Sequence, residues 1–149
     1  MKMLGFMITW TTYGTWLQGD ERGYVKNGQI RPRNEALTKA NTALQSQDTV
    51  RLSKAQQEVV QTAIIKQAQL RDHHIHALAV RSNHIHIVLE YTPEPISRIV
   101  AYYKNAARLA LKAMGHCGKL WTKGYDKRFC FDTKALEQRT KYVERHTNI

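Results

Sequence analysis

Apolar and polar residues recur along the chain with two different periods, and these periods predict its secondary structure. Residues 4–12, LGFMITWTT, are rich in β-forming side chains and predict a first strand. Further along, Ser53 and Gln56 form a capping-box pair, after which apolar residues recur every three or four positions. This pattern predicts an amphipathic helix that ends near Asp72.

Two strand-like runs, HIHALAV and HIHIVLE, follow at residues 74–80 and 84–90 and predict a β-hairpin. The prolines that come directly afterwards end the hairpin, because a proline has no amide hydrogen to donate to the ladder. The rest of the chain predicts three more elements: a helix over residues 96–114, a strand over 127–132 and a helix over 133–146.

The order of these elements is strand, helix, strand, strand, helix, strand, helix. That order predicts an α+β fold, a ferredoxin-like antiparallel sheet with helices on one face. Since two helices already cover that face, the last helix is expected on the opposite face. The chain is expected to form a single domain over residues 1–149. A polar segment over residues 25–50 interrupts the pattern, and EALTKANTAL (residues 35–44) predicts a short helix within it.

The second strand of the hairpin divides its side chains between two faces. Its residues 85, 87 and 89 are Ile, Ile and Leu and point toward the core, whereas His84 and His86 point the other way. A three-residue loop over residues 81–83 is expected to bring His74 and His76 to the histidine face. The same loop adds these residues to the core: Ile75, Ala77 and Ala79. A two-residue loop would reverse the faces, and its mixed polarity makes it less favoured.

Charge and composition narrow the class of protein. The chain has 23 lysine and arginine residues against 12 acidic ones, a formal net charge of +11 that favours nucleic acid as a partner. A solvated basic surface or an anionic membrane would also suit this charge. The sequence has no run of about 18 apolar residues and no export signal, so neither a membrane span nor secretion is expected. Cys117 and Cys130 are too few for a disulfide framework and indicate the cytoplasm.

His84 and His86 are the first candidates for chemistry. Residues two positions apart on a strand stand about 6–7 Å apart at Cα, so both imidazoles can reach one metal ion. The alternative is that they are ordinary polar residues of a sheet face. On the last helix, Tyr142 and His146 lie one turn apart. If that helix covers the histidine face, it can deliver His146 as a third ligand with the tyrosine hydroxyl beside it. The alternative is that Tyr142 is a packing residue of an amphipathic helix and that His146 lies in a frayed helix end.

Four segments occur in an order that resembles a known family, the single-tyrosine HUH transposases, in which HUH stands for His-hydrophobe-His. They are TWTTYGTWLQGDERG, RSNHIHIVLE, LWTKGYDKRFCF and KYVERH. The likeness is to the insertion-sequence-200-like and REP-associated tyrosine transposases. It implies that His84 and His86 are paired metal ligands and that Tyr142 is the nucleophile. It also implies a third ligand at His146, where the family usually has Gln or Asn.

The resemblance implies an enzyme that cleaves and rejoins single-stranded DNA, at hairpin or foldback sequences, through a 5′-phosphotyrosine intermediate. A phenol ionises only near about pH 10, so a metal ion is needed to polarise the phosphate that it attacks. Mg²⁺ or Mn²⁺ is implied as the cofactor, and imidazole ligands suit Mn²⁺ better. Family members are typically homodimers in which the tyrosine helix can serve the partner subunit.

Basic and aromatic residues around these segments are candidates for DNA contacts. The candidates for phosphate contacts, each equally a candidate for solvated surface charge, are Arg81, Lys104, Arg108, Lys112, Lys123 and Arg128. The candidates for base stacking, for at least half of which packing is the favoured interpretation, are Tyr13, Trp16, Trp121 and Tyr125. Tyr102 and Tyr103 are not expected to be nucleophiles, because Tyr103 follows the apolar stripe of its helix.

Two other functions fit parts of the sequence. A non-catalytic nucleic-acid-binding module on a ferredoxin-like sheet would stack bases on sheet aromatics, but the polar face carries histidines instead. A small zinc hydrolase could use the same histidines and would leave Tyr142 without a role. A covalent adduct between protein and DNA would separate the transposase from both alternatives.

Overall fold

The computed structural model describes residues 2–15, 24–26, 29–31 and 48–147. Its helices and strands, in chain order, are β1 (Gly5–Thr11), β2 (Tyr24–Lys26), β3 (Gln29–Arg31), α2 (Lys54–Leu70), β4 (Ile75–Val80), β5 (His84–Glu90), α3 (Ile96–Ala113), β6 (Asp126–Cys130) and α4 (Thr133–Thr147). Every element predicted within these ranges is present, with ends that differ by at most two residues. The short helix expected over residues 35–44 lies outside them. Among the described residues, no helix is both long and apolar enough to cross a membrane.

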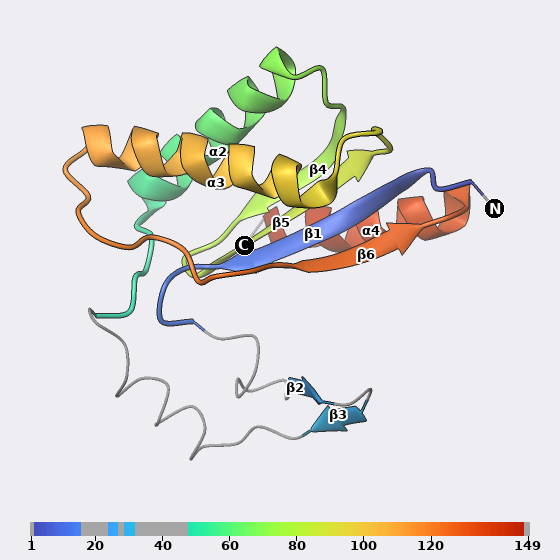
Figure 1. Ribbon diagram of the computed structural model, residues 1–149, viewed down its shortest axis with the longest axis horizontal. Helices are drawn as coiled ribbons and strands as arrows, with labels where there is room; N and C mark the ends of the chain where they lie inside the picture. The colour runs from blue at the N-terminus through green and yellow to red at the C-terminus, as the bar shows by residue number, and fades with distance from the viewer. Residues whose placement is uncertain (1, 16–23, 27–28, 32–47, 148–149) are drawn as a thin grey trace.

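Four of the strands form one sheet in the order β4-β5-β1-β6, and neighbouring strands run antiparallel. β5 and β1 are the two central strands, as Figure 1 shows. With β2 and β3 left aside, the chain order is β1-α2-β4-β5-α3-β6, the βαββαβ pattern of a ferredoxin-like fold. The predicted fold class is therefore confirmed. β2 and β3 pair with each other in a separate sheet.

α2 and α3 cover one face of the sheet and form the main core with it (Figure 1). α2 begins at its predicted capping box, in which the Ser53 hydroxyl accepts a hydrogen bond from the Gln56 amide and the Gln56 side chain accepts one from the Ser53 amide. Its buried residues recur every four positions, at Val60, Ile64 and Ala68. From the sheet, the main core takes Phe6, Ile8, Trp10, Ile85, Ile87 and Leu89.

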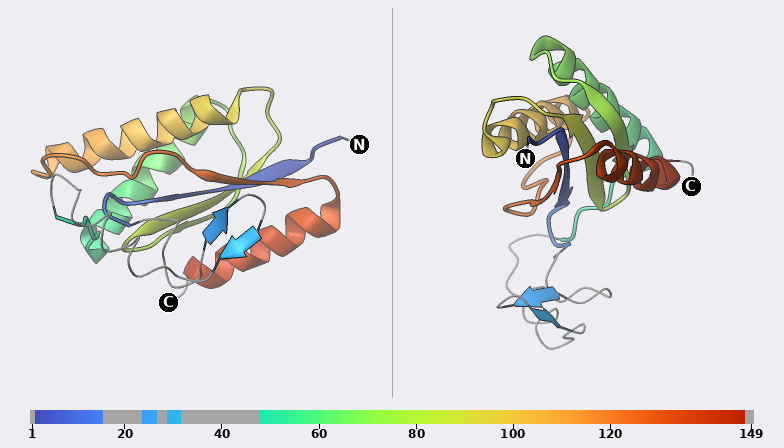
Figure 2. Two further views of the ribbon diagram at one scale, coloured as in Figure 1. Left: turned by 60° about the horizontal axis from the view of Figure 1, so that its bottom comes forward. Right: turned by 90° about the vertical axis from the view of Figure 1, so that its right-hand side faces the viewer.

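α4 covers the opposite face, as predicted (Figure 2). The helix begins after Asp132, whose carboxylate accepts a hydrogen bond of 2.7 Å from the Ala135 amide. Its buried contact with the sheet is a small cluster of Met7, Ala77, Ala79, Val88 and Val143. The approach is close, because a Cβ atom placed on Gly5 of β1 would lie only 2.9 Å from Cδ1 of Leu136. Small residues on the sheet therefore let α4 pack against it.

The hairpin between β4 and β5 has a two-residue loop, so the predicted three-residue loop is wrong. The Arg81 amide donates a 2.9 Å hydrogen bond to the His84 carbonyl, which leaves residues 82–83 as the loop. Ala79 consequently pairs with His86 and shares its face of the sheet.

This register corrects the predicted faces of β4. Ala77 and Ala79 lie under α4 and not in the main core, whereas Leu78 and Val80 pack against the main core. The larger side chains of β4 fill the deeper space under α2 and α3, and the alanines make room for α4. Side-chain size, rather than the count of polar residues on each face, decides the pairing.

A β-bulge between Ile75 and Ala77 shifts the pairing by one residue at the start of β4. Ile75 therefore packs against the main core, as predicted, and His76 lines a pocket together with residues of α4. His74 is exposed, and its ring centroid lies 4.8 Å from that of His76. His76 thus reaches the α4 face through the bulge, not through the pairing that the sequence predicted.

Candidate active site

The two histidines of β5 lie on the sheet face that α4 covers. They alternate with Ile85 along the strand, which directs them away from the main core. The ring centroids of His84 and His86 are 4.8 Å apart. His86 is 3% exposed and His84 is half-buried, so the pair extends from the interior toward solvent.

Each of these two imidazoles has an oxygen partner at Nδ1. The hydroxyl of Thr9, directly opposite His86 on β1, lies 2.7 Å from His86 Nδ1. The side-chain oxygen of Asn83 accepts a 2.8 Å hydrogen bond from His84 Nδ1. With Nδ1 engaged, Nε2 is the nitrogen through which either ring would bind an ion. No sequence signal marks Thr9 as part of the site, because 77 positions separate it from His86 and only strand pairing joins them.

α4 brings Tyr142 and His146 to this pair. The Tyr142 ring centroid lies 5.5 Å from that of His86, and the His146 centroid lies 5.1 Å from His86 and 6.4 Å from His84. The Tyr142 and His146 centroids are 4.5 Å apart, as expected for residues one helical turn apart. His146 Nδ1 donates a 2.8 Å hydrogen bond to the Tyr142 carbonyl. The residues singled out in the sequence as nucleophile and ligands therefore gather at one place, within one chain.

The donor set suits a divalent transition metal, and the ring spacing is compatible with one. An imidazole bound through Nε2 has its centre about 3 Å from the ion, so two ligating rings stand roughly 4.5–6.5 Å apart. All three centroid separations among His84, His86 and His146 fall in that range. As the side chains lie, however, no three His, Cys, Asp or Glu residues in the described ranges bring their donor atoms together to hold an ion. Binding would therefore require the imidazoles to turn toward one another.

Arg81 lies beside this site and contacts α4. Its guanidinium Nη1 donates a 2.8 Å hydrogen bond to the backbone carbonyl of His146. A cation at the last turn of a helix stabilises carbonyl groups that lack a partner within the helix. Arg81 thus joins the hairpin to the end of α4. A phosphate contact by Arg81 stays a prediction.

Lys104, Arg108 and Lys112 lie on α3, which packs on the other face of the sheet from the histidines. The Lys104 ammonium donates to the carbonyls of Thr122 and Gly124 at 3.0 and 2.8 Å, and burial lowers the pKa of this group. Arg108 donates to the Asn105 side chain. Their phosphate contacts stay predictions, but these would form on a surface remote from the histidine face.

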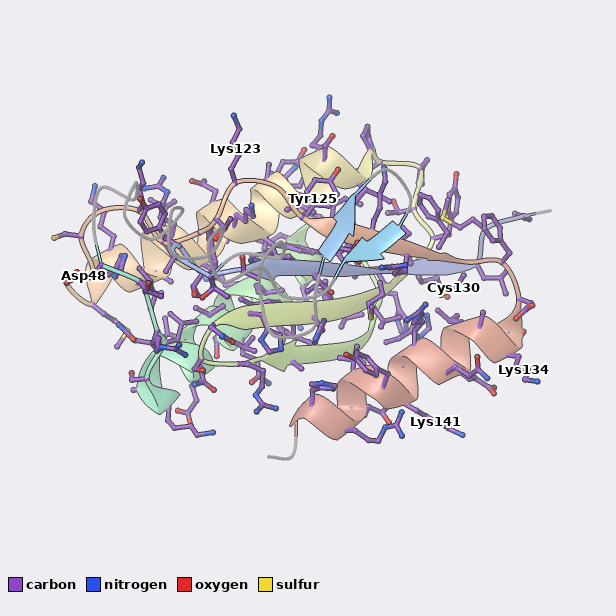
Figure 3. The ribbon with its side chains drawn as sticks, turned by 90° about the horizontal axis from the view of Figure 1, so that it is seen from below. Asp48, Lys123, Tyr125, Cys130, Lys134 and Lys141 are labelled. Atoms are coloured by element: carbon purple, nitrogen blue, oxygen red, sulfur yellow. The ribbon has the colours of Figure 1, made fainter. Side chains whose placement is uncertain are left out.

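The two remaining basic candidates lie near β6. Lys123 is exposed in the loop before the strand, and Figure 3 shows it at the opposite edge of the sheet from α4. Arg128 pairs with Met7 across the sheet, which places it on the same face as α4. Its guanidinium forms an exposed ion pair of 3.1 Å with Asp126. Of the six basic candidates, Arg81 and Arg128 thus share the face of the histidines.

Most of the aromatic candidates for base stacking are packing residues. Tyr13 is 7% exposed, and Trp121 packs edge-on against Trp10 while its indole N–H donates to the Lys104 carbonyl. Tyr125 is half-buried against the main core, and Trp16 lies outside the described residues. A stacking role for these residues stays a prediction.

Tyr103 is fully buried in the main core, as predicted from its place on the apolar stripe. Its hydroxyl lies 2.6 Å from His73 Nδ1, and burial raises its pKa. The ring of Tyr102 stacks under the Arg71 guanidinium at 3.4 Å. Both tyrosines are therefore engaged in packing on the helix that lies across the sheet from His84 and His86.

Solved structures share this fold, and two of them are described as transposases. A REP-associated tyrosine transposase bound to a REP hairpin aligns with a TM-score of 0.57 and 16% identity, over 96% of this chain and 66% of that chain. A candidate transposase from Deinococcus radiodurans R1 aligns with a TM-score of 0.51 and 17% identity, over 100% of this chain and 95% of that one. No curated protein sequence matches the chain.

The sequence itself matches a family model. The model describes the family as "Transposase IS200 like" and matches residues 43–146, which is more than half of the chain. The matched range contains the hairpin with both histidines, and it contains α4 as far as His146. The chain belongs to the IS200-like transposase family.

Proposed function

We propose that this transposase cleaves and rejoins single-stranded DNA, with Tyr142 as the nucleophile. The observation that carries the proposal is the position of the Tyr142 ring, 5.5 Å from His86 and 4.5 Å from His146. A tyrosine in the main core could not meet a DNA backbone, but Tyr142 packs against the cluster under α4 and is only half-buried. It is therefore accessible to a strand that enters beside the histidines.

The reaction exchanges one phosphodiester for another. The Tyr142 hydroxyl oxygen forms a bond to phosphorus while the bond from phosphorus to the 3′ oxygen breaks. The tyrosine proton is balanced by the proton that the leaving 3′ oxygen takes up, so the products are a 5′-phosphotyrosine and a free 3′-hydroxyl. Attack by a second 3′-hydroxyl reverses these bond changes on a new strand, and no external energy source is needed.

His84, His86 and His146 would hold a divalent ion, Mn²⁺ or Mg²⁺, through Nε2. When bound, the ion would polarise the scissile phosphate and neutralise its charge. Imidazole nitrogen favours Mn²⁺ over Mg²⁺, which prefers oxygen ligands. The chain's own residues orient the rings: Thr9 and Asn83 engage Nδ1 of the two β5 histidines. Arg81 holds the last turn of the helix that carries His146.

The proposed substrate is single-stranded DNA that carries a hairpin. Two observations support this class, the net charge of +11 and the shared fold with a transposase solved on a REP hairpin. α4 packs on the sheet of its own chain, which favours attack within one subunit. We also propose the homodimer that the family resemblance implies, with each α4 packed on the sheet of its own subunit.

A gel assay tests the proposal. The protein is incubated with a labelled hairpin-bearing single strand and Mn²⁺, and a covalent adduct is sought on a denaturing gel. We expect an adduct with the wild type and none with Tyr142→Phe. Tyr91→Phe is the matched control, since Tyr91 is 45% exposed beyond the end of β5, and it should form the adduct normally. An adduct that survives in Tyr142→Phe would contradict the proposal, and binding without any adduct would support the non-catalytic module.

A further inference from the structure

Thr9 and His86 form a buried pair across the two central strands. Their residues are directly opposite in the β1–β5 register, and Oγ1 of Thr9 lies 2.7 Å from Nδ1 of His86. Thr9 is 6% exposed and His86 is 3% exposed, so water does not readily replace either partner. A buried imidazole nitrogen needs a hydrogen-bond partner, and here the sheet itself supplies one.

The other threonines at this end of β1 use their hydroxyls differently. Thr11 donates to the Thr15 carbonyl and Thr12 donates to the Val50 carbonyl, both at 2.6 Å. Those bonds hold backbone segments that follow β1 or precede α2. The hydroxyl of Thr9 instead meets a side chain, and that side chain is one of the proposed ligands.

All three proposed ligands have an oxygen at Nδ1. The partners are the Thr9 hydroxyl for His86, the Asn83 amide oxygen for His84 and the Tyr142 carbonyl for His146. An amide or backbone carbonyl oxygen can only accept, so His84 and His146 donate from Nδ1, which leaves Nε2 as the nitrogen that can ligate. The same tautomer in His86 would make Nε2 the ligating atom in all three rings.

We propose that Thr9 is a positioning residue, which accepts a hydrogen bond from Nδ1 of His86 and thereby makes Nε2 the ring nitrogen that binds the ion. This inference rests on the proposed function of His86 as a ligand. Without the hydroxyl, Nδ1 of His86 would lose its hydrogen-bond partner, and the proton could shift to Nε2, which blocks ligation. Partners of this kind typically change metal affinity by about 10- to 100-fold.

Two substitutions separate the hydroxyl from the shape of the side chain. Thr9→Val keeps the β-branched shape and removes the oxygen, whereas Thr9→Ser keeps the oxygen. We expect Thr9→Val to weaken Mn²⁺ binding by about 10- to 100-fold and Thr9→Ser to stay within about threefold of the wild type. Binding is measured on the free protein from the electron paramagnetic resonance signal of unbound Mn²⁺. Thr122→Val is the matched control, because it also removes a threonine hydroxyl that donates within the protein, here to the Thr12 and Thr15 carbonyls, and it should leave Mn²⁺ affinity unchanged.

A second readout needs no metal. Nitrogen-15 NMR of the metal-free protein should show the Nδ1–H tautomer at His86 in the wild type and Thr9→Ser, and a mixture in Thr9→Val. Wild-type Mn²⁺ affinity or an unchanged tautomer in Thr9→Val would overturn the inference. A wild type that binds no Mn²⁺ would overturn it as well. The Tyr142→Phe adduct assay is read separately, so failure of the nucleophile and failure of this positioning role give different results.

Discussion

The two faces of the sheet differ in how they are built. Within the described residues, the face under α2 and α3 contributes to a core of sixteen buried hydrophobic residues, whereas the cluster under α4 has five. The larger core contains the large side chains, including Trp10, Ile64 and Leu111, and the smaller one contains two alanines. Buried apolar area sets most of the folding free energy, so the first face carries the stability.

The face under α4 combines small apolar residues with buried polar side chains. On the central strands β1 and β5, the cross-strand pair Thr9 and His86 lies on this face. The neighbouring pair, Ile8 and Ile87, lies on the other face. Alternation along each strand therefore separates the two roles residue by residue. The comparison teaches that α4 is held by few apolar contacts, so the helix that carries Tyr142 should detach more easily than the core unfolds.

The largest effect is expected from a cavity in the main core. Ile87→Ala removes a fully buried side chain from β5 and should lower the free energy of unfolding by about 2–5 kcal/mol. Urea denaturation followed by circular dichroism measures this loss. If Ile87→Ala lowered the free energy of unfolding by less than Val143→Ala does, the two faces would not differ as described.

A cavity under α4 should affect the reaction more than the fold. Val143→Ala removes two buried methyl groups and should cost about 2 kcal/mol in the docking of α4. We expect the yield of covalent DNA adduct to fall while the urea midpoint of the main core changes little. Hydrogen exchange should show faster exchange in α4 and unchanged exchange in α2. Equal changes in both helices would mean that α4 and the core unfold as one unit.

Arg81 can have two roles, stabilising the end of α4 or contacting a DNA phosphate, and a substitution separates them. Arg81→Gln removes the guanidinium that donates to the His146 carbonyl and should destabilise the last turn of α4 by about 1 kcal/mol. The measurement is hydrogen exchange over residues 143–147, which should become faster. If Arg81 instead contacts only a phosphate, exchange would stay the same, and the salt dependence of DNA binding would become less steep.

The smallest expected effect is on the pH dependence of stability, through His76 in the pocket between β4 and α4. Burial lowers the pKa of His76 from 6.5, neighbouring His74 lowers it further, and Glu90 opposes the shift. The other charged groups that line this pocket are Glu137, Lys141 and Glu144. Because the folded pKa is lower than the unfolded one, the unfolded chain binds more protons as the pH falls below about 6.5, and stability decreases.

His76→Gln should therefore make the free energy of unfolding less dependent on pH between about pH 7.5 and pH 5. Urea titrations of the wild type and the variant at several pH values measure the two slopes. Identical slopes would show that His76 is not protonated differently in the folded and unfolded chains.

Periodicity predicted the fold well because each element carries its own local signal. The capping box of α2 and the apolar stripe of α3 depend on neighbours within one or two turns, and both appear where the sequence places them. The position of α4 was predicted because two helices already cover one face of the sheet, which leaves the opposite face for the third. The hairpin loop was predicted wrongly, because the polarity of the two faces favoured a three-residue loop. The observed register instead places Leu78 and Val80 against the main core and the alanines under α4.

The sequence by itself determined which chemical groups are present and on which elements they lie, namely two histidines alternating on a strand and a tyrosine one turn before a third histidine on a helix. Only the tertiary structure decided how closely the rings of these residues approach one another, that Thr9 engages His86, and that Arg81 contacts α4. The physical reason is that alternation and helical periodicity are local properties of the backbone. Strand pairing and helix docking depend on the fit of side chains far apart in the chain, which no short stretch of sequence contains.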